Sequence, residues 1–160
     1  MILKVVAVGK LREKHWQDAV SDYARRLRPY ARLEMVEIPE ARIPESPTPA
    51  QEKIALEKEA SAILERLRDH EGPLIALDRQ GTALDSVQLS AWLQARALEG
   101  GNEMAWVIGG PLGLASSVLE RADLVLSISS MTFPHQMMRP ILLEQIYRSF
   151  RIMHHEPYHK

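Results

Sequence analysis

The feature that most constrains the fold is a regular alternation of short, mainly apolar runs with longer segments of helical periodicity. The runs that predict strands are Ile2–Val8, Leu33–Ile38, Leu74–Leu77, Met104–Ile108 and Leu124–Ile128. Strands that are apolar along their whole length are typical of sheets buried on both faces. Because they alternate with helical segments, the sequence predicts an α/β fold, a parallel-rich sheet with helices on both faces.

The segments between these runs repeat apolar residues at the spacing of an amphipathic helix. The five expected helices cover Trp16–Leu27, a segment that begins at Pro49 with Thr48 as its cap, a segment capped by Ser86, Ser116–Arg121, and residues 139–153. Residues 39–49 hold four prolines among charged residues, which predicts a long exposed loop rather than a domain linker.

Length and composition narrow the function classes. A chain of 160 residues is expected to form one domain, and its net charge of −1 gives no general attraction for nucleic acid, so an RNA partner would need a local basic patch. The absence of cysteine excludes disulfides, thiolate metal sites and a cysteine nucleophile. The first residues lack the charged region of a signal peptide and are too few to cross a membrane, so we expect a cytoplasmic protein without membrane contact.

Two loops in the last third of the chain stand out. Gly109, Gly110 and Gly113 follow one predicted strand, and a Ser/Thr-rich loop that runs to Pro134 follows the next. Glycine lets a ligand approach the backbone closely, and loops at the ends of neighbouring strands form the usual ligand crevice of an open α/β sheet. The two loops therefore predict a ligand site, and a valine at Gly110 is expected to abolish binding while leaving the fold intact.

Each of these features also has a plainer interpretation. The glycine segment matches neither GxGxxG nor a P-loop, and an isolated glycine pair is commonly only a tight turn. His135, in the second loop, is either a general base or a hydrogen-bonding loop residue. Glu144 and Arg148 lie four residues apart on the last helix, which favours a surface ion pair.

The C-terminal segment, residues 148–160, is more basic than the rest of the chain. It carries two arginines, Lys160, three histidines and Tyr158, against the single acid Glu156. Cations interleaved with an aromatic ring suit phosphate contact and base stacking, and a frayed end is the alternative. The histidine spacing matches no zinc site, so we predict no bound metal.

Four stretches of the sequence resemble one protein family. They are Ala7–Lys10, the Ile-Gly-Gly-x-x-Gly of Ile108–Gly113, the Met-Thr-Phe-Pro-His-Gln-Met-Met-Arg of Met131–Arg139, and the closing Pro157–Lys160. The chain is similar nearly end to end to the ribosomal large-subunit pseudouridine N3-methyltransferases, small members of the SPOUT class.

This resemblance implies a single SPOUT domain over residues 1–160, with a deep trefoil knot in roughly residues 104–160, a rare exception to the rule against threaded chains. It implies a homodimer and S-adenosylmethionine as methyl donor. The residues that would hold this cofactor by matching position are Leu77, Gly109, Gly110, Ile128, Ser129, Ser130, Met131, Thr132 and Phe133.

The implied reaction places a methyl group on N3 of a pseudouridine in 23S rRNA of the assembled ribosome. A base nitrogen of this kind must be aligned behind the methyl group and must lose its proton. The polar candidates for this task are His135, Arg148, Tyr158 and His159, and the choice of general base stays open, as does sharing of the site between subunits. The alternatives are a SPOUT tRNA methyltransferase and a non-catalytic ribosome-binding factor.

Overall fold

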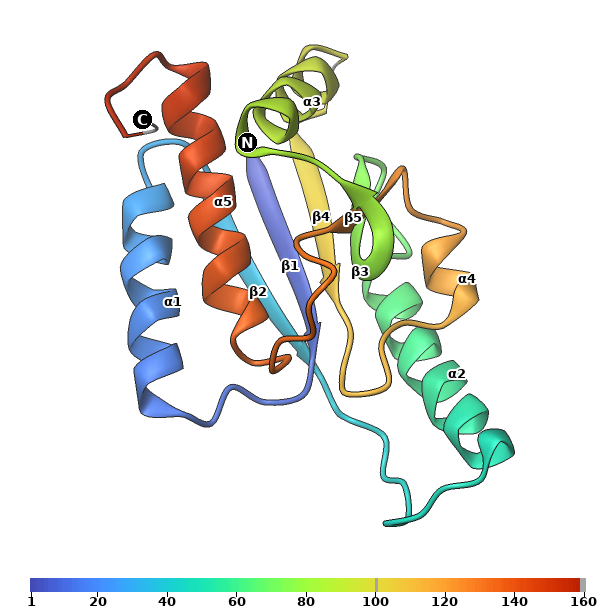
Figure 1. Ribbon diagram of the computed structural model, residues 1–160. Helices are drawn as coiled ribbons and strands as arrows, with labels where there is room; N and C mark the ends of the chain where they lie inside the picture. The colour runs from blue at the N-terminus through green and yellow to red at the C-terminus, as the bar shows by residue number, and fades with distance from the viewer. Residues whose placement is uncertain (100, 159–160) are drawn as a thin grey trace.

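The chain forms a five-stranded, all-parallel sheet with helices on both sides (Figure 1). The computed structural model describes residues 1–99 and 101–158. The elements in chain order are β1 (Ile2–Val8), α1 (Lys14–Leu27), β2 (Arg32–Ile38), α2 (Pro49–Arg66), β3 (Leu74–Ala83), α3 (Ser86–Leu98), β4 (Glu103–Ile108), α4 (Ser116–Leu119), β5 (Leu124–Ser127) and α5 (Met138–Met153). The strand order is β2-β1-β4-β3-β5, which confirms the expected fold class.

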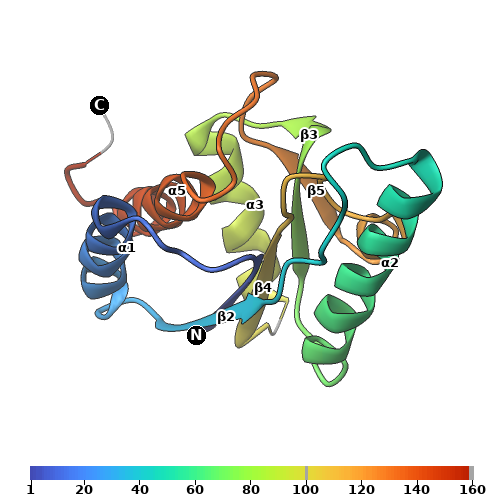
Figure 2. The same cartoon turned by 90° about the horizontal axis from the view of Figure 1, so that it is seen from below.

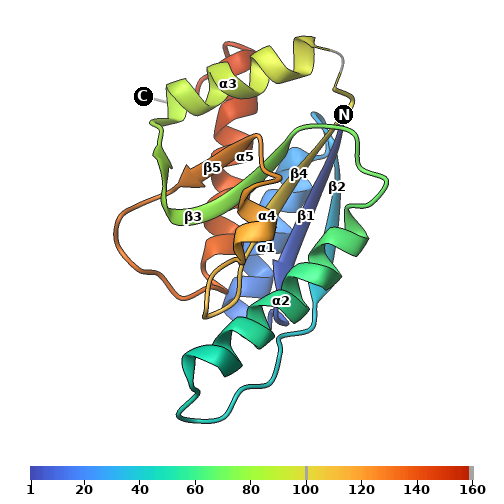
Figure 3. The ribbon, with the colours of Figure 1, turned by 90° about the vertical axis from the view of Figure 1, so that its right-hand side faces the viewer.

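Two apolar cores lie on opposite faces of the sheet. Helices α1, α3 and α5 cover one face, and α2 and α4 cover the other (Figure 3). The central strand β4 supplies both cores, since Trp106 packs on the α5 side and Val107 on the α2 side, each fully buried. Burial on both faces explains why this strand is apolar at consecutive positions.

The start of α2 follows the prediction, whereas the start of α3 differs by one residue. Thr48 caps α2 through a capping box with Gln51 and is followed by Pro49. Asp85, not Ser86, caps α3: its carboxylate accepts a hydrogen bond from the Gln88 backbone, and the Gln88 side chain accepts one in return. The Ser86 hydroxyl instead donates to the Gln145 side chain of α5.

Strand β3 extends six residues beyond its predicted end at Leu77, to Ala83. Leu77 and Thr82 both pair with Leu126 of β5, so residues 78–81 form an irregular bulge between them. A Cβ on Gly81 would lie 2.5 Å from the Val125 carbonyl oxygen, which shows how closely the two backbones approach. Because the bulge is polar, the apolar run in the sequence ends at Leu77 and does not indicate the rest of the strand.

Because all strands are parallel, their carboxyl ends share one edge of the sheet. Figure 2 views the molecule from this side, where the loops after β1, β4 and β5 gather. This edge is the usual place for a ligand in an open α/β sheet. The trefoil knot expected in residues 104–160 is a property of chain threading rather than of strand order, and it stays a prediction.

Candidate active site

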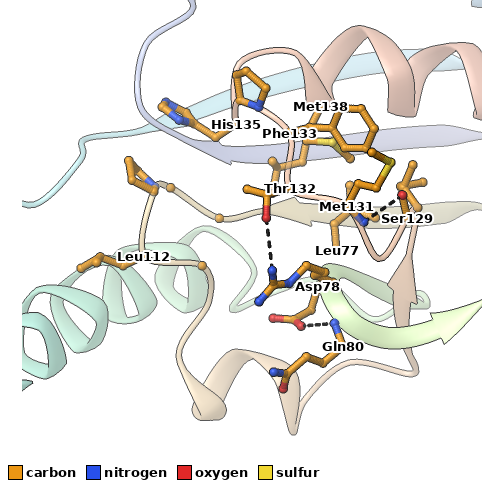
Figure 4. Close-up of a pocket in the computed structure, with 18 of the residues that line it drawn as sticks. Leu77, Asp78, Gln80, Leu112, Ser129, Met131, Thr132, Phe133, His135 and Met138 are labelled. Carbon is orange, nitrogen blue, oxygen red and sulfur yellow. Dashed lines mark hydrogen bonds between the residues drawn. The ribbon is translucent and has the colours of Figure 1, made fainter.

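An open pocket of about 810 Å³ lies at this edge of the sheet, against the ends of β3, β4 and β5 (Figure 4). Its walls are the β3 bulge, the glycine loop after β4 and the loop that joins β5 to α5. Every residue that the resemblance assigns to the cofactor lines this pocket except Ser130. The predicted meeting of the two loops is therefore what the structure shows.

The glycine loop is both a tight turn and a wall of the pocket. The Gly113 amide donates to the Gly110 carbonyl at 3.0 Å, and Gly113 has a φ of +83°, which favours glycine. A Cβ on Gly109 would lie 2.4 Å from the Gly113 carbonyl oxygen, so this close approach also requires glycine. A Cβ on Gly110 would lie 3.0 Å from Val8 Cγ1 in the core, so a valine there would press on the core as well as on the pocket wall, and its effect on the fold stays a prediction.

The pocket mouth is bridged by side chains from the β3 bulge and the β5–α5 loop. Arg79 Nη1 donates to Thr132 Oγ1 at 3.2 Å, and the neighbouring Met131 is 72% exposed (Figure 4). Asp78, which also lines the pocket, accepts a hydrogen bond from the Gln80 amide at 2.7 Å. These bulge residues are not among the site residues predicted from the sequence. The signal for them is a polar run directly after a buried strand.

His135 lies at the pocket beside the loop that follows β1. A Cβ on Gly9 would lie 3.6 Å from His135 Nε2, so the imidazole packs against the glycine. The next residue, Gln136, accepts a hydrogen bond from the Arg12 amide at 3.2 Å. The β1–α1 loop and the β5–α5 loop therefore run side by side at the site.

A buried arginine that is not among the predicted site residues holds these two loops together. Arg139, at the start of α5, is 1% exposed, donates to the Glu37 carboxylate at 2.7 Å, and also donates to the backbone oxygens of Val8 and Gly9. Partial burial acts to raise the pKa of Glu37, but hydrogen bonds from the Leu11 amide and Arg139 outweigh it and lower the pKa below its ordinary value. The carboxylate is thus kept ionised beside its cation.

A second polar cluster forms around Glu144 on α5. Arg148 donates to Glu144 Oε1 through Nε at 3.0 Å and Nη2 at 2.6 Å, and the Tyr158 hydroxyl donates to the same oxygen at 3.1 Å. Tyr158 also packs edge-on against Tyr147, with ring centres 4.9 Å apart. The chain is therefore ordered against α5 as far as Tyr158, which contradicts a frayed end up to this residue. The Glu144–Arg148 pair is half-buried rather than a plain surface pair.

Burial and hydrogen bonds with Tyr23 and Glu144 raise the pKa of Tyr158 far above that of an ordinary phenol. Tyr158 is therefore a neutral hydrogen-bond donor at physiological pH. A phenol held in this form does not serve as a ready proton acceptor. The pKa thus weighs against Tyr158 as the general base, and favours a role in contact or positioning.

The structure separates the candidate catalytic residues into two places. The candidate His135 lines the pocket, as does Met138, the first residue of α5. Arg148 lies ten residues beyond Met138 along this helix, a rise of about 15 Å at 1.5 Å per residue. Neither Arg148 nor Tyr158 lines the pocket of its own chain. The fourth candidate, His159, lies outside the described residues.

Within residues 1–99 and 101–158, no group of three or more His, Asp or Glu side chains is placed to hold a metal ion. No helix in this described part of the chain has the length and apolar character needed to cross a membrane.

Comparison with known proteins supports the resemblance seen in the motifs. The sequence model of one family, described as "Predicted SPOUT methyltransferase", matches residues 1–159. A protein of Moorella thermoacetica named ribosomal RNA large subunit methyltransferase H is 48% identical over 99% of this chain and 98% of its own length. A protein of Symbiobacterium thermophilum with the same name is 48% identical over the full length of both chains.

Among solved structures, a probable methylase family protein from Haemophilus influenzae aligns over 99% of this chain and 70% of its own, with a TM-score of 0.58 and 12% identity. This likeness concerns the fold. The family match and the two relatives, together with the motifs that the pocket brings together, lead to one assignment. The chain belongs to the SPOUT methyltransferase family.

Proposed function

We propose that this chain transfers a methyl group from S-adenosylmethionine to N3 of a pseudouridine in the 23S RNA of the large ribosomal subunit. The observation that carries the proposal is the full-length similarity, at 48% identity, to relatives named as large-subunit rRNA methyltransferases. The pocket supports it, because the Ile-Gly-Gly and Met-Thr-Phe-Pro-His motifs line one cavity.

The pocket fits S-adenosylmethionine in size and chemistry. Its volume of about 810 Å³ is in the usual range for small-molecule sites. Leu77, Ile128 and Met131 provide apolar surface for the faces of an adenine ring, and the backbone of the glycine turn and of residues 128–133 provides hydrogen-bonding groups for its edges. The bound cofactor supplies an electrophilic methyl group on sulfur.

The chain's own residues must then place the base and remove its proton. His135 is the candidate that lies at the pocket of its own chain and can exchange a proton. The hydrogen bond from the Arg12 backbone amide to the Gln136 side chain and the contact with Gly9 fix the loop that carries His135. Such fixed positioning matters because a misplaced nucleophile costs roughly 10²-fold in rate.

A homodimer would explain why Arg148 and Tyr158 lie away from the pocket. We propose that the C-terminal segment of one subunit completes the pocket of the other, so that Arg148 and Tyr158 contact the RNA there. The separation of about 15 Å along α5 supports this arrangement, since one chain does not bring both sets of residues together. The net charge of −1 favours a preformed target, the assembled ribosome in the cytoplasm, over free RNA.

The test is methylation of ribosomes from a strain that lacks the modification, followed by mass mapping of the product nucleoside. We expect one methyl group on N3 of a pseudouridine in 23S rRNA. Methylation of tRNA instead would favour the tRNA methyltransferase alternative. Calorimetry that detects no binding of S-adenosylmethionine would favour a non-catalytic ribosome-binding factor.

A further inference from the structure

We propose that Lys10 and Arg12 bind phosphates of the RNA strand beside the cofactor pocket. They belong to the loop between β1 and α1, and residues 9–12 are called the rim loop below. This inference rests on the proposed function, because it assumes that the substrate is RNA. It assigns a role to Lys10 of the Ala7–Lys10 motif, whose side chain neither the pocket nor the proposed chemistry uses.

The rim loop lies directly beside the pocket residue His135. Gly9, whose φ is +86°, turns the chain away from β1, and the position of its absent Cβ is 3.6 Å from His135 Nε2. The Arg12 amide donates to the Gln136 side chain at 3.2 Å. Lys10 and Arg12 therefore belong to a loop that borders the pocket at His135.

The backbone of the rim loop is fixed by hydrogen bonds on each side. The Gly9 amide donates to the Ile38 carbonyl at 2.8 Å, and the Leu11 amide donates to Glu37 Oε1 at 2.9 Å. Arg139, on α5, donates to the carbonyl of Gly9. Because the backbone is already held, binding through the exposed side chains pays little of the ordering entropy that a mobile loop would lose.

The charges of the rim loop suit a polyanion. Lys10 and Arg12 are exposed, and within residues 1–99 and 101–158 neither side chain forms an ion pair or hydrogen bond. The next cation along the chain, Lys14, is paired with Asp18 at 2.5 Å. The nearby Glu37 carboxylate is bound to Arg139, and the charge of Lys10 acts on it without forming an ion pair.

The exposed Glu13 follows the rim loop directly, and Glu40 Oε2 lies 3.4 Å from the position of an added Gly9 Cβ, so the surface is not uniformly basic. Two free cations beside a catalytic pocket suit contacts with individual phosphates rather than general attraction. A chain of net charge −1 needs such a local patch to hold RNA.

The experiment uses the full-length protein and large ribosomal subunits that lack the modification. Lys10→Ala, Arg12→Ala and the double variant are compared with the wild type for particle binding across a series of KCl concentrations, for S-adenosylmethionine binding, and for methyl transfer. Arg66→Ala is the matched control, because Arg66 is an exposed cation at the far end of α2, toward the opposite edge of the sheet.

Each single substitution is expected to lower the slope of log Kd against log salt by about one, and the double variant by about two. The loss in kcat/KM should match the loss in affinity, while kcat, cofactor affinity and the Arg66→Ala control stay at wild-type values. Wild-type affinity and slope in the double variant would overturn the rim loop proposal, as would failure of the wild-type protein to bind the particles. Binding with the expected salt response but without methylation would contradict the proposed function and would still support phosphate binding by the rim loop.

Discussion

The guanidinium carbon of Arg148 lies 4.7 Å from the centre of the Tyr158 ring, and both side chains contact the same oxygen of Glu144. The three groups therefore form one unit in which the cation, the ring and the carboxylate fix one another. Double contacts of this kind hold a planar guanidinium in one orientation. The unit presents an oriented aromatic surface and a cation at the C-terminal end of the chain.

Deletion of residues 157–160 removes the aromatic member of this unit. We expect cofactor affinity to stay nearly unchanged, because the pocket lies elsewhere on the chain. Methylation should fall by roughly 10²-fold or more, since base stacking contributes ~1–3 kcal/mol per base and misplacement of the nucleophile adds to the loss. Calorimetry and a methylation assay measure the two effects, and Tyr158→Phe, which keeps the ring, should lose less. Full activity of the deletion variant would contradict a role for this segment in catalysis.

Gly109→Ala is expected to abolish binding of S-adenosylmethionine with little damage to the sheet. The added Cβ would meet the backbone of Gly113 within the same loop, so the distortion falls on the pocket wall. Ser61→Ala serves as a control, since Ser61 is an exposed residue of α2 that does not line the pocket. Cofactor affinity by calorimetry and unfolding midpoints check both variants, and wild-type affinity in Gly109→Ala would exclude the glycine loop from the site.

Mixed dimers test whether one site draws on two subunits. A subunit without residues 157–160 is combined with a Gly109→Ala subunit, each inactive alone. If the C-terminal segment completes the partner's pocket, one site of the mixed dimer is intact and activity returns. Absence of rescue in a verified mixed dimer would confine each site to its own chain, and a monomer mass by sedimentation would contradict the homodimer itself.

Arg139→Met is expected to lower the free energy of unfolding by roughly 1–3 kcal/mol or more, because it leaves the buried carbonyls of Val8 and Gly9 without their donor. Glu37→Gln should cost less, since an amide oxygen can still accept from Leu11 and Arg139. The lowered pKa of Glu37 gives stability that is present above the ordinary carboxyl range and is lost as pH falls through the folded-state pKa. Urea unfolding at several pH values should show this acid loss in the wild type and less of it in Glu37→Gln.

Glu59→Gln is expected to stabilise the protein at neutral pH. Glu59 is 5% exposed and accepts a hydrogen bond from the Ala41 amide at 2.8 Å, and burial raises its pKa. The group therefore favours folding at pH values below about 4.5, and this contribution is lost as pH rises through the raised pKa. The gain from glutamine should appear at pH 7 and vanish in acid, while the exposed Glu57→Gln control changes little at either pH. Destabilisation at neutral pH would show that the carboxylate has a stabilising partner.

The sequence predicted the elements that build the pocket because their signals are local. Within residues 1–99 and 101–158, continuous apolar runs and helical periodicity identified the five strands and the five helices. Glycine and proline identified the loops after β4 and β5, and parallel topology placed these loops together. Burial on both faces of a parallel sheet leaves a strong pattern in a single sequence.

The parts that the sequence did not predict depend on long-range contacts. Arg139 reads as an ordinary charged residue at the start of a helix, and its burial follows from partners on β1 and β2. Strand β3 extends to Ala83 because it pairs with β5, and the polar sequence of this segment does not predict such pairing. Arg148 and Tyr158 belong to the same family resemblance as His135, yet nearness to a motif along the chain does not place them at the pocket.

The contact between Arg139 and Gly9 joins residues that are 130 positions apart. Contacts of such long sequence separation form late, because the chain must first lose the entropy of closing a large loop. During synthesis, β1 leaves the ribosome long before α5 is made. The growing chain can therefore pair its early strands, but the pocket at their carboxyl ends stays incomplete. We therefore expect the site to be complete only once the last helix has docked, so that a chain truncated before α5 binds neither methyl donor nor RNA.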